Sequence, residues 1–158
     1  GIEIDLVSKP YKGVSVIAGY SYNDMRYTKT TGATGSFIEG DRLVRTPQHT
    51  ANLSFFYTVQ TGVLKNVSVG AIGNYIGDRL GGWNNQVNPA YPNGIWDREI
   101  PVNGYTTIDV SLGYNWKQFS LLCKLSNITN ELNYTMHENY SVNPIAPRQI
   151  LTSLRYKF

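Results

Sequence analysis

Apolar and polar residues alternate one by one along several segments of the chain. In the segment 14–23, Val14, Val16 and Ala18 alternate with Ser15 and Gly19. Successive side chains of an extended strand point to opposite faces, so this pattern predicts a β-strand with one apolar and one polar face. The same pattern returns seven times, at 2–6, 14–23, 51–57, 67–75, 107–114, 119–126 and 150–158.

The connections between these segments alternate in length. Short connections are predicted at 9–12, 60–65 and 115–118, and long ones rich in Gly, Asn, Pro and Thr at 28–46, 79–103 and 129–147. An up-and-down meander that crosses a membrane has tight turns on the periplasmic side and long loops outside. The regular alternation of short and long connections therefore predicts such a meander.

The two faces of the predicted strands fit a membrane barrel, in which the outer face meets lipid and the inner face meets water. Ile17, Phe56 and Ile72 interrupt the polar face. Residues expected to face lipid are Leu53, Phe55, Val69, Val110, Leu112, Leu121 and Leu154, and residues expected to face the lumen are Asn52, Ser68, Asp109, Ser111, Lys124 and Arg155. Aromatic residues gather at the short-turn ends, as in an interfacial girdle: Tyr57, Tyr114, Trp116, Phe119, Tyr156 and Phe158.

Seven is an odd number of strands, whereas closed bacterial barrels have an even number and begin at about eight. We therefore expect an all-β fold, an antiparallel up-and-down meander of about seven long strands that forms the C-terminal portion of a large transmembrane β-barrel.

The last strand carries a further signal. Its sequence, I-L-T-S-L-R-Y-K-F, ends in an aromatic residue preceded by apolar residues at alternate positions. It resembles the terminal strand of bacterial outer-membrane barrels, which the barrel assembly machinery recognises. The resemblance implies that Leu154, Tyr156 and Phe158 form a C-terminal assembly signal.

Composition and charge argue against several other functions. The net charge is only +3 and the basic residues are scattered, so no nucleic-acid partner is expected. The single Cys123 and the widely separated His49 and His137 do not have metal-ligand spacing. Glu138 lies beside His137, but no nucleophile accompanies them. We expect no enzymatic activity, metal or cofactor.

Three segments, 101–116, 119–134 and 146–158, resemble in order and spacing the last strands of TonB-dependent outer-membrane receptors of the ferric-siderophore type. The sequences R-T-P-Q-H at 45–49 and G-D-R at 77–79 are also similar to that family. The resemblance implies a 22-stranded barrel, closed by an N-terminal plug, that imports ferric chelates with energy passed from the inner membrane. Residues 1–158 would then be a C-terminal segment of that barrel, with no plug domain and no energy-coupling box among them.

Two residues within the resembling segments have expected structural roles. Asn127 lies where a strand leaves the barrel, and its side chain is suited to bond neighbouring backbone and end the ladder. Pro147 precedes the last strand, where the missing N–H is tolerated, and Arg148 follows at the rim.

The long connection 79–103 is the best candidate for ligand recognition. Its aromatic side chains supply flat amphipathic surface, and its arginines supply charge complementary to an anionic chelate. The predicted ligand-binding residues are Arg79, Trp83, Tyr91, Trp96 and Arg98. In the alternative, the aromatic residues pack the loop against its neighbours or lie at the lipid interface.

The sequence thus predicts the wall and vestibule of a ferric-siderophore receptor energised through TonB. The expected partners are a ferric siderophore, the TonB complex acting through the plug, outer-membrane lipid and lipopolysaccharide, and the barrel assembly machinery. Two alternatives remain, a porin-like outer-membrane barrel without energy coupling and a soluble β-sandwich that binds carbohydrate.

Overall fold

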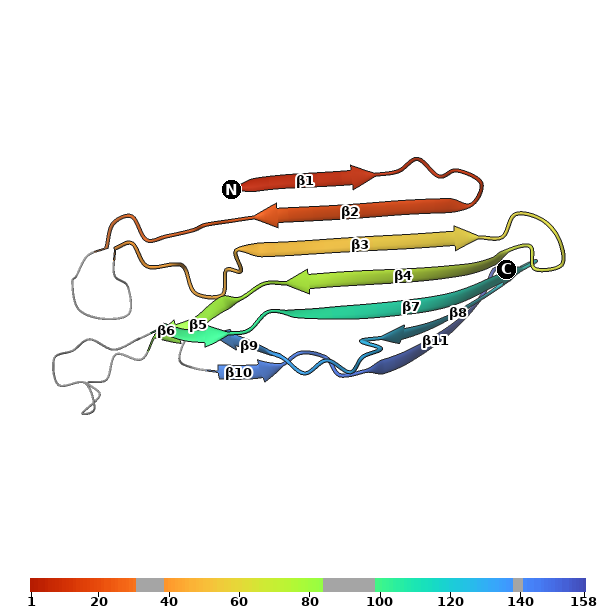
Figure 1. Cartoon of the computed structure of the whole chain (residues 1–158). Helices are drawn as coiled ribbons and strands as arrows, with labels where there is room; N and C mark the ends of the chain where they lie inside the picture. Colours follow the sequence, from red (N-terminus) through yellow and green to blue (C-terminus); the bar gives the residue numbers. More distant parts are fainter. Residues whose placement is uncertain (31–38, 84–98, 138–140) are drawn as a thin grey trace.

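The computed structural model describes residues 1–30, 39–83, 99–137 and 141–158, and they form one large antiparallel sheet and two small ones (Figure 1). The large sheet has seven strands in the order β1-β2-β3-β4-β7-β8-β11. Its strands are β1 (Ile2–Val7), β2 (Val14–Tyr22), β3 (His49–Thr58), β4 (Val67–Ile76), β7 (Tyr105–Trp116), β8 (Phe119–Ser126) and β11 (Gln149–Tyr156). None of the described residues belongs to a helix long and apolar enough to cross a membrane.

The seven strands predicted from the alternation are confirmed. Each of them pairs with the next in antiparallel fashion, and each agrees with its predicted range to within about two residues. The short connections lie at one end of the sheet and the long ones at the other (Figure 1). The predicted all-β meander is therefore the observed fold.

The long connections contain four short strands that the sequence pattern did not predict. They form two separate hairpin-like pairs, β5 (Arg79–Trp83) with β6 (Glu99–Val102), and β9 (Tyr134–His137) with β10 (Ser141–Pro144). Each strand has only four or five residues, too few for an alternation to stand out. Glycines in R-L-G-G-W and proline in E-I-P-V weaken the strand signal further.

The register of the large sheet places apolar residues beside apolar residues. Phe55 pairs with Val16 on one side and with Ala71 on the other, and Ala71 pairs in turn with Val110. Because side chains directly opposite one another lie on the same face, these residues form one apolar row across four strands. The register places the seven residues expected to face lipid on this same face of the sheet, where all seven are exposed.

The first short turn has the geometry of a tight hairpin. Lys12 and Gly13 both have positive φ, 49° and 86°, and Tyr11 bridges to Val14. Positive φ at both central positions defines a type I′ turn, whose twist matches that of the flanking strands. A Cβ atom on Gly13 would lie 2.1 Å from the carbonyl oxygen of Thr58, so the turn also requires glycine for close approach to β3.

Aromatic rings lie in contact at the short-turn end of the sheet. The ring of Phe119 lies 6.2 Å from Trp116 and 4.9 Å from Tyr156, and Tyr156 lies 5.0 Å from Phe158. These ring contacts lie where the aromatic girdle was predicted, on β7, β8, β11 and the C-terminal Phe158.

A second aromatic group lies at the opposite end of the sheet. Tyr20 and Tyr22 of β2 lie beside His49 of β3, and the hydroxyl oxygen of Tyr20 is 2.8 Å from His49 Nδ1. Two aromatic groups at the two ends of an apolar band are the arrangement expected where strands cross both membrane interfaces.

A charge introduced at the middle of β3 should cost different amounts of stability on the two faces of the sheet. Leu53→Arg should destabilise the complete receptor by about 2 to 4 kcal/mol, because it places a charge in hydrocarbon. Asn52→Arg, one residue away on the opposite face, should cost far less. Asn52 lies on the polar face, where its side chain and the carboxylate of Asp5 both lie beside Gly19. Equilibrium folding into phospholipid bilayers measures both, and equal losses would contradict the membrane orientation of the sheet.

Candidate functional site

Buried side chains gather at the long-loop end, around β5 and β6. Every residue of β5 is buried, and Trp83 is only 2% exposed. Leu80, Trp83 and Val102 are the buried hydrophobic residues of the described part of the chain. The apolar core therefore lies among the long connections, and none of these buried hydrophobic residues of the described chain belongs to the large sheet.

Arg79 joins two of the long connections. Its Nη1 donates a hydrogen bond to the Asn103 carbonyl at 3.2 Å, and its Nη2 donates to Asn133 Oδ1 at 3.0 Å and to the Tyr134 carbonyl. The guanidinium carbon lies 5.3 Å from the ring centre of Tyr105. These contacts hold the start of β9 against the end of β6.

Trp83 joins β5 to the connection between β2 and β3. Its ring lies 6.1 Å from that of Tyr27, and the backbone N–H of Arg45 donates to the Leu80 carbonyl at 2.7 Å. The connection 23–48 is thereby fixed to β5 at two points. With the contacts of Arg79, all three long connections meet at one short strand.

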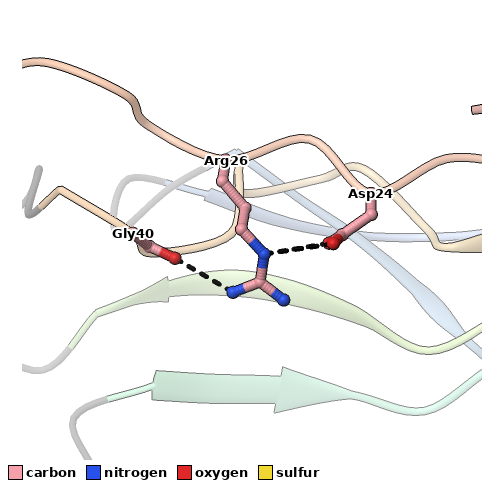
Figure 2. A network of polar contacts seen from close by, with 3 residues as sticks. All are labelled: Asp24, Arg26 and Gly40. Atoms are coloured by element: carbon pink, nitrogen blue, oxygen red, sulfur yellow. Dashed lines mark hydrogen bonds and ion pairs between the residues drawn. The ribbon is translucent and has the colours of Figure 1, made fainter.

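The base of the connection 23–48 is itself held by a small polar network (Figure 2). Arg26 Nε lies 3.1 Å from Asp24 Oδ1, and Nη1 donates to the Gly40 carbonyl at 3.0 Å. The hydrogen bond from Arg26 holds the pKa of Asp24 below its ordinary value. The Asp24–Arg26 pair is therefore formed at neutral pH and is lost as the pH falls through that lowered pKa.

Asn127 organises the connection between β8 and β11. Its Nδ2 donates to the carbonyls of Glu131 and Ala146, both at 3.0 Å, and its Oδ1 accepts from the Glu131 N–H at 2.8 Å. Its own N–H donates to Asp109 Oδ1 at 2.9 Å. Asn127 is 4% exposed and has a φ of 49°, so it turns the chain out of the β-ladder. The structural role expected for it is confirmed.

Described residues at this end of the sheet line two cavities, and Tyr105 belongs to both linings. The first has a volume of about 230 Å³ and lies against β5, with Arg79, Leu80 and Met136 among its lining residues. The second has a volume of about 340 Å³ and is lined by Asp109 among other residues, mostly polar, of β7, β8 and the 127–149 segment.

The pattern of alternation places both cavities on the polar face of the sheet. Tyr105, Thr107 and Asp109 alternate with the apolar residues of β7, and Tyr105 pairs with Ile76 of β4. Asp109 also forms an ion pair of 2.7 Å with Lys124. Both cavities therefore lie on the face predicted to line the lumen, at the long-loop end of the sheet.

The five predicted ligand-binding residues have different outcomes. Arg79 and Trp83 are buried and hold the long connections together, which is the packing role considered as the alternative for this loop's aromatic residues. Tyr91, Trp96 and Arg98 lie outside the described residues. Direct ligand contact by any of the five stays a prediction. The described residues contain no group of three or more His, Cys, Asp or Glu side chains placed to bind a metal.

The structure also reveals residues that the sequence analysis did not single out as site residues. Asn133, 8% exposed, donates to the Asn103 carbonyl as well as accepting from Arg79. Arg45, Tyr105 and Met136 line the first cavity. A buried Asn within a long polar connection looks in sequence like any exposed loop residue, so the sequence alone contained no separate signal for Asn133.

An antiparallel sheet with one apolar face and one polar face, whose long connections meet at β5 at one end, is typical of a segment of a transmembrane barrel wall. Comparison with protein families agrees. Residues 1–129 match the family described as TonB dependent receptor-like, beta-barrel, and the chain belongs to this family. The family consists of transporters of the bacterial outer membrane, not enzymes.

Individual relatives and a solved structure are also similar to this chain. The ferrichrome outer membrane transporter/phage receptor of Escherichia coli K12 is 24% identical over all of this chain, which spans 20% of that protein. The metal-pseudopaline receptor CntO of Pseudomonas aeruginosa is also 24% identical over the whole chain and 20% of its own length. The ferripyoverdine receptor of P. aeruginosa, solved with ferripyoverdine, superposes with a TM-score of 0.74 at 21% identity over 99% of this chain and 19% of its own. This chain thus spans about a fifth of the relatives' length.

The network of Asn127 generates a prediction. Asn127→Asp replaces the donor Nδ2 with an acceptor that faces two carbonyl oxygens, and should weaken the 127–148 connection by at least about 2 kcal/mol. Asn130→Asp is the matched control, because the hydrogen bond of the Asn130 side chain with the described residues is made by its Oδ1, which accepts the Arg148 N–H. Hydrogen exchange of this segment in the complete receptor measures the difference, and equal protection in the two variants would contradict the role given to Nδ2.

Proposed function

We propose that this chain is the C-terminal segment of the barrel of a receptor that takes up ferric siderophores and is energised through TonB. The family assignment supports the barrel and its location in the outer membrane. The relatives named above carry siderophore or metallophore cargo according to their names. A ferric chelate is therefore the proposed substrate class.

One observation carries this proposal beyond the fold. The three long connections meet at β5 and border cavities on the polar face of the sheet. A recognition site requires side chains held in fixed positions on a rigid scaffold, and a connected set of loops above a vestibule supplies such positions. A barrel that admits solutes only by diffusion does not require side chains held in fixed positions. This observation therefore favours a receptor over the porin-like alternative.

The β-sandwich alternative is not supported. A sandwich buries the inner faces of two packed sheets, whereas the seven-stranded sheet of the described residues exposes large hydrophobic side chains across its apolar face. The family match also assigns the chain to a membrane barrel.

The proposed ligand-binding residues divide into two kinds. Arg79 and Trp83 act at the base of the site, where they fix the connection 79–103 to its neighbours. Tyr91, Trp96 and Arg98 are proposed to contact the chelate directly, through flat aromatic surface and positive charge.

The remaining partners follow from the same proposal. The polar face of the sheet would enclose an N-terminal plug through which the TonB complex acts. The apolar face would meet lipid and, at the outer interface, lipopolysaccharide. The barrel assembly machinery would recognise Leu154, Tyr156 and Phe158.

Substitution within the external loop tests the substrate class. In the complete receptor, the triple change Tyr91→Ala, Trp96→Ala and Arg98→Ala should weaken binding of a ferric siderophore at least about tenfold, through loss of aromatic and cationic contacts. Trp83 stays unchanged because it is buried against Tyr27.

Binding is measured by titration of a panel of ferric siderophores against purified receptor. Trp116→Ala, an exposed aromatic residue at the short-turn end, is the control and should leave affinity unchanged. Unaltered affinity of the triple variant for a chelate that the wild type binds would refute the role of these three residues, and binding of no chelate would refute the function.

Removal of the terminal aromatic residue tests the assembly signal. Phe158→Ala should lower the amount of folded receptor in the outer membrane several-fold, because the exposed Phe158 ring completes the aromatic group with Tyr156. Lys157→Ala, a change on the neighbouring residue, is the control. The folded fraction is read from heat-modifiable mobility on gels, and normal levels of the Phe158 variant would argue against the signal.

A further inference from the structure

The first cavity, of about 230 Å³, is lined by two arginines and by no acidic residue among those the structure describes. We infer that this cavity, between Arg45 and Arg79, is a binding subsite for an anionic group carried on an apolar or aromatic moiety, such as an aryl carboxylate. The inference rests on the proposed function in assigning this subsite to the bound chelate.

The charge of Arg79 is the first argument. Arg79 is 7% exposed, and its described hydrogen-bond acceptors are two backbone carbonyls and one side-chain amide, all neutral. No carboxylate of the described residues lies within ion-pairing distance of it. A buried cation is stabilised by neutral dipoles only in part, so its site favours an anion.

The position of Arg45 is the second argument. Its backbone N–H is bonded to the Leu80 carbonyl, and its φ of 65° lies in the left-handed region. The side chain is exposed yet lines the same cavity as Arg79, and it makes no ion pair with the described residues. The fold therefore holds a second guanidinium at the cavity, and no carboxylate of the described residues neutralises it.

The nearest acidic residue in sequence does not change this picture. Asp78 precedes Arg79, but its Oδ1 accepts the N–H of Gly104 at 2.7 Å, and Asp78 does not line the cavity. Asp109 lines the other cavity and is paired with Lys124. The described residues that line the first cavity therefore carry a positive net charge.

The other lining residues indicate which kind of moiety would carry the anionic group. Most of the other lining side chains are apolar, among them Ile76, Leu80, Val102 and Met136, and Tyr105 adds an aromatic face. A small inorganic anion would leave this apolar surface unused. A ring or short hydrocarbon that ends in a carboxylate would bury its apolar part here and place its charge beside the guanidiniums.

A fragment probe tests the subsite without knowledge of the natural chelate. Binding of 4-fluorobenzoate to the complete receptor in detergent is titrated by ¹⁹F NMR, alongside the uncharged 4-fluorobenzyl alcohol. The wild type should bind the benzoate more tightly than the alcohol. Arg45→Gln should weaken the benzoate at least about tenfold and leave the alcohol unchanged, since only the charge interaction is removed.

Two further variants serve as comparisons for Arg45→Gln. Arg148→Gln changes an arginine that does not line the cavity, and should bind the benzoate like the wild type. Gly81→Leu should weaken both probes, because a Cβ at this lining position already meets Met136 Sδ and the larger side chain fills the space.

The outcomes separate the subsite from the proposed function. Absence of benzoate binding to the wild type, or equal binding to the wild type and Arg45→Gln, would overturn the subsite. Failure of the receptor to bind any ferric siderophore would overturn the proposed function, and that measurement is independent of the fragment titration.

Discussion

Hydrogen bonding of the backbone within lipid is the constraint on which the large sheet depends. Hydrocarbon offers no partner to an unpaired N–H or C=O group, so a chain that crosses it as strands must pair each strand with its neighbours. The continuous antiparallel ladder from β1 to β11 satisfies the interior strands of this segment. The same ladder fixes the register, and the register in turn gathers the apolar side chains on one face.

Beyond the ends of the ladder, interactions other than strand pairing hold the chain together. There the backbone meets water, and structure depends on tertiary contacts between segments distant in sequence. β5 supplies them through a buried guanidinium, a buried indole and one backbone carbonyl. The chain therefore has its apolar core where it leaves the sheet, an inversion of the usual arrangement in which the sheet itself forms the core.

The sequence predicted the large sheet well because its two signals are local. The period of two is visible in any strand of eight or more residues with one apolar face, and the short connections follow directly as the brief gaps between alternating segments. The first aromatic group was also visible, since Trp116 and Phe119 flank one tight turn. The second was not identified, because Tyr20 and His49 meet only through the pairing of β2 with β3.

The contacts of the candidate site could not be predicted in the same way. Arg79 and Asn133 are 54 positions apart, and a bond between a guanidinium and an amide leaves no periodic trace in the sequence. Trp83 was selected for its aromatic surface, but whether a loop tryptophan is exposed or buried depends on the segment that covers it. Asn127 was predictable because its partners Glu131 and Asp109 follow from the local strand end and the adjacent strand.

The meeting of three connections at β5 has a consequence for how such receptors diverge. A connection that shares its core with two others is not an independent module, so its replacement alone would leave complementary surfaces of the other two without a partner. New specificities would then arise through joint replacement of all three connections, or through changes at positions that point away from β5. Chimaeras between relatives should accordingly retain structure when 23–48, 77–104 and 127–148 are exchanged as a set.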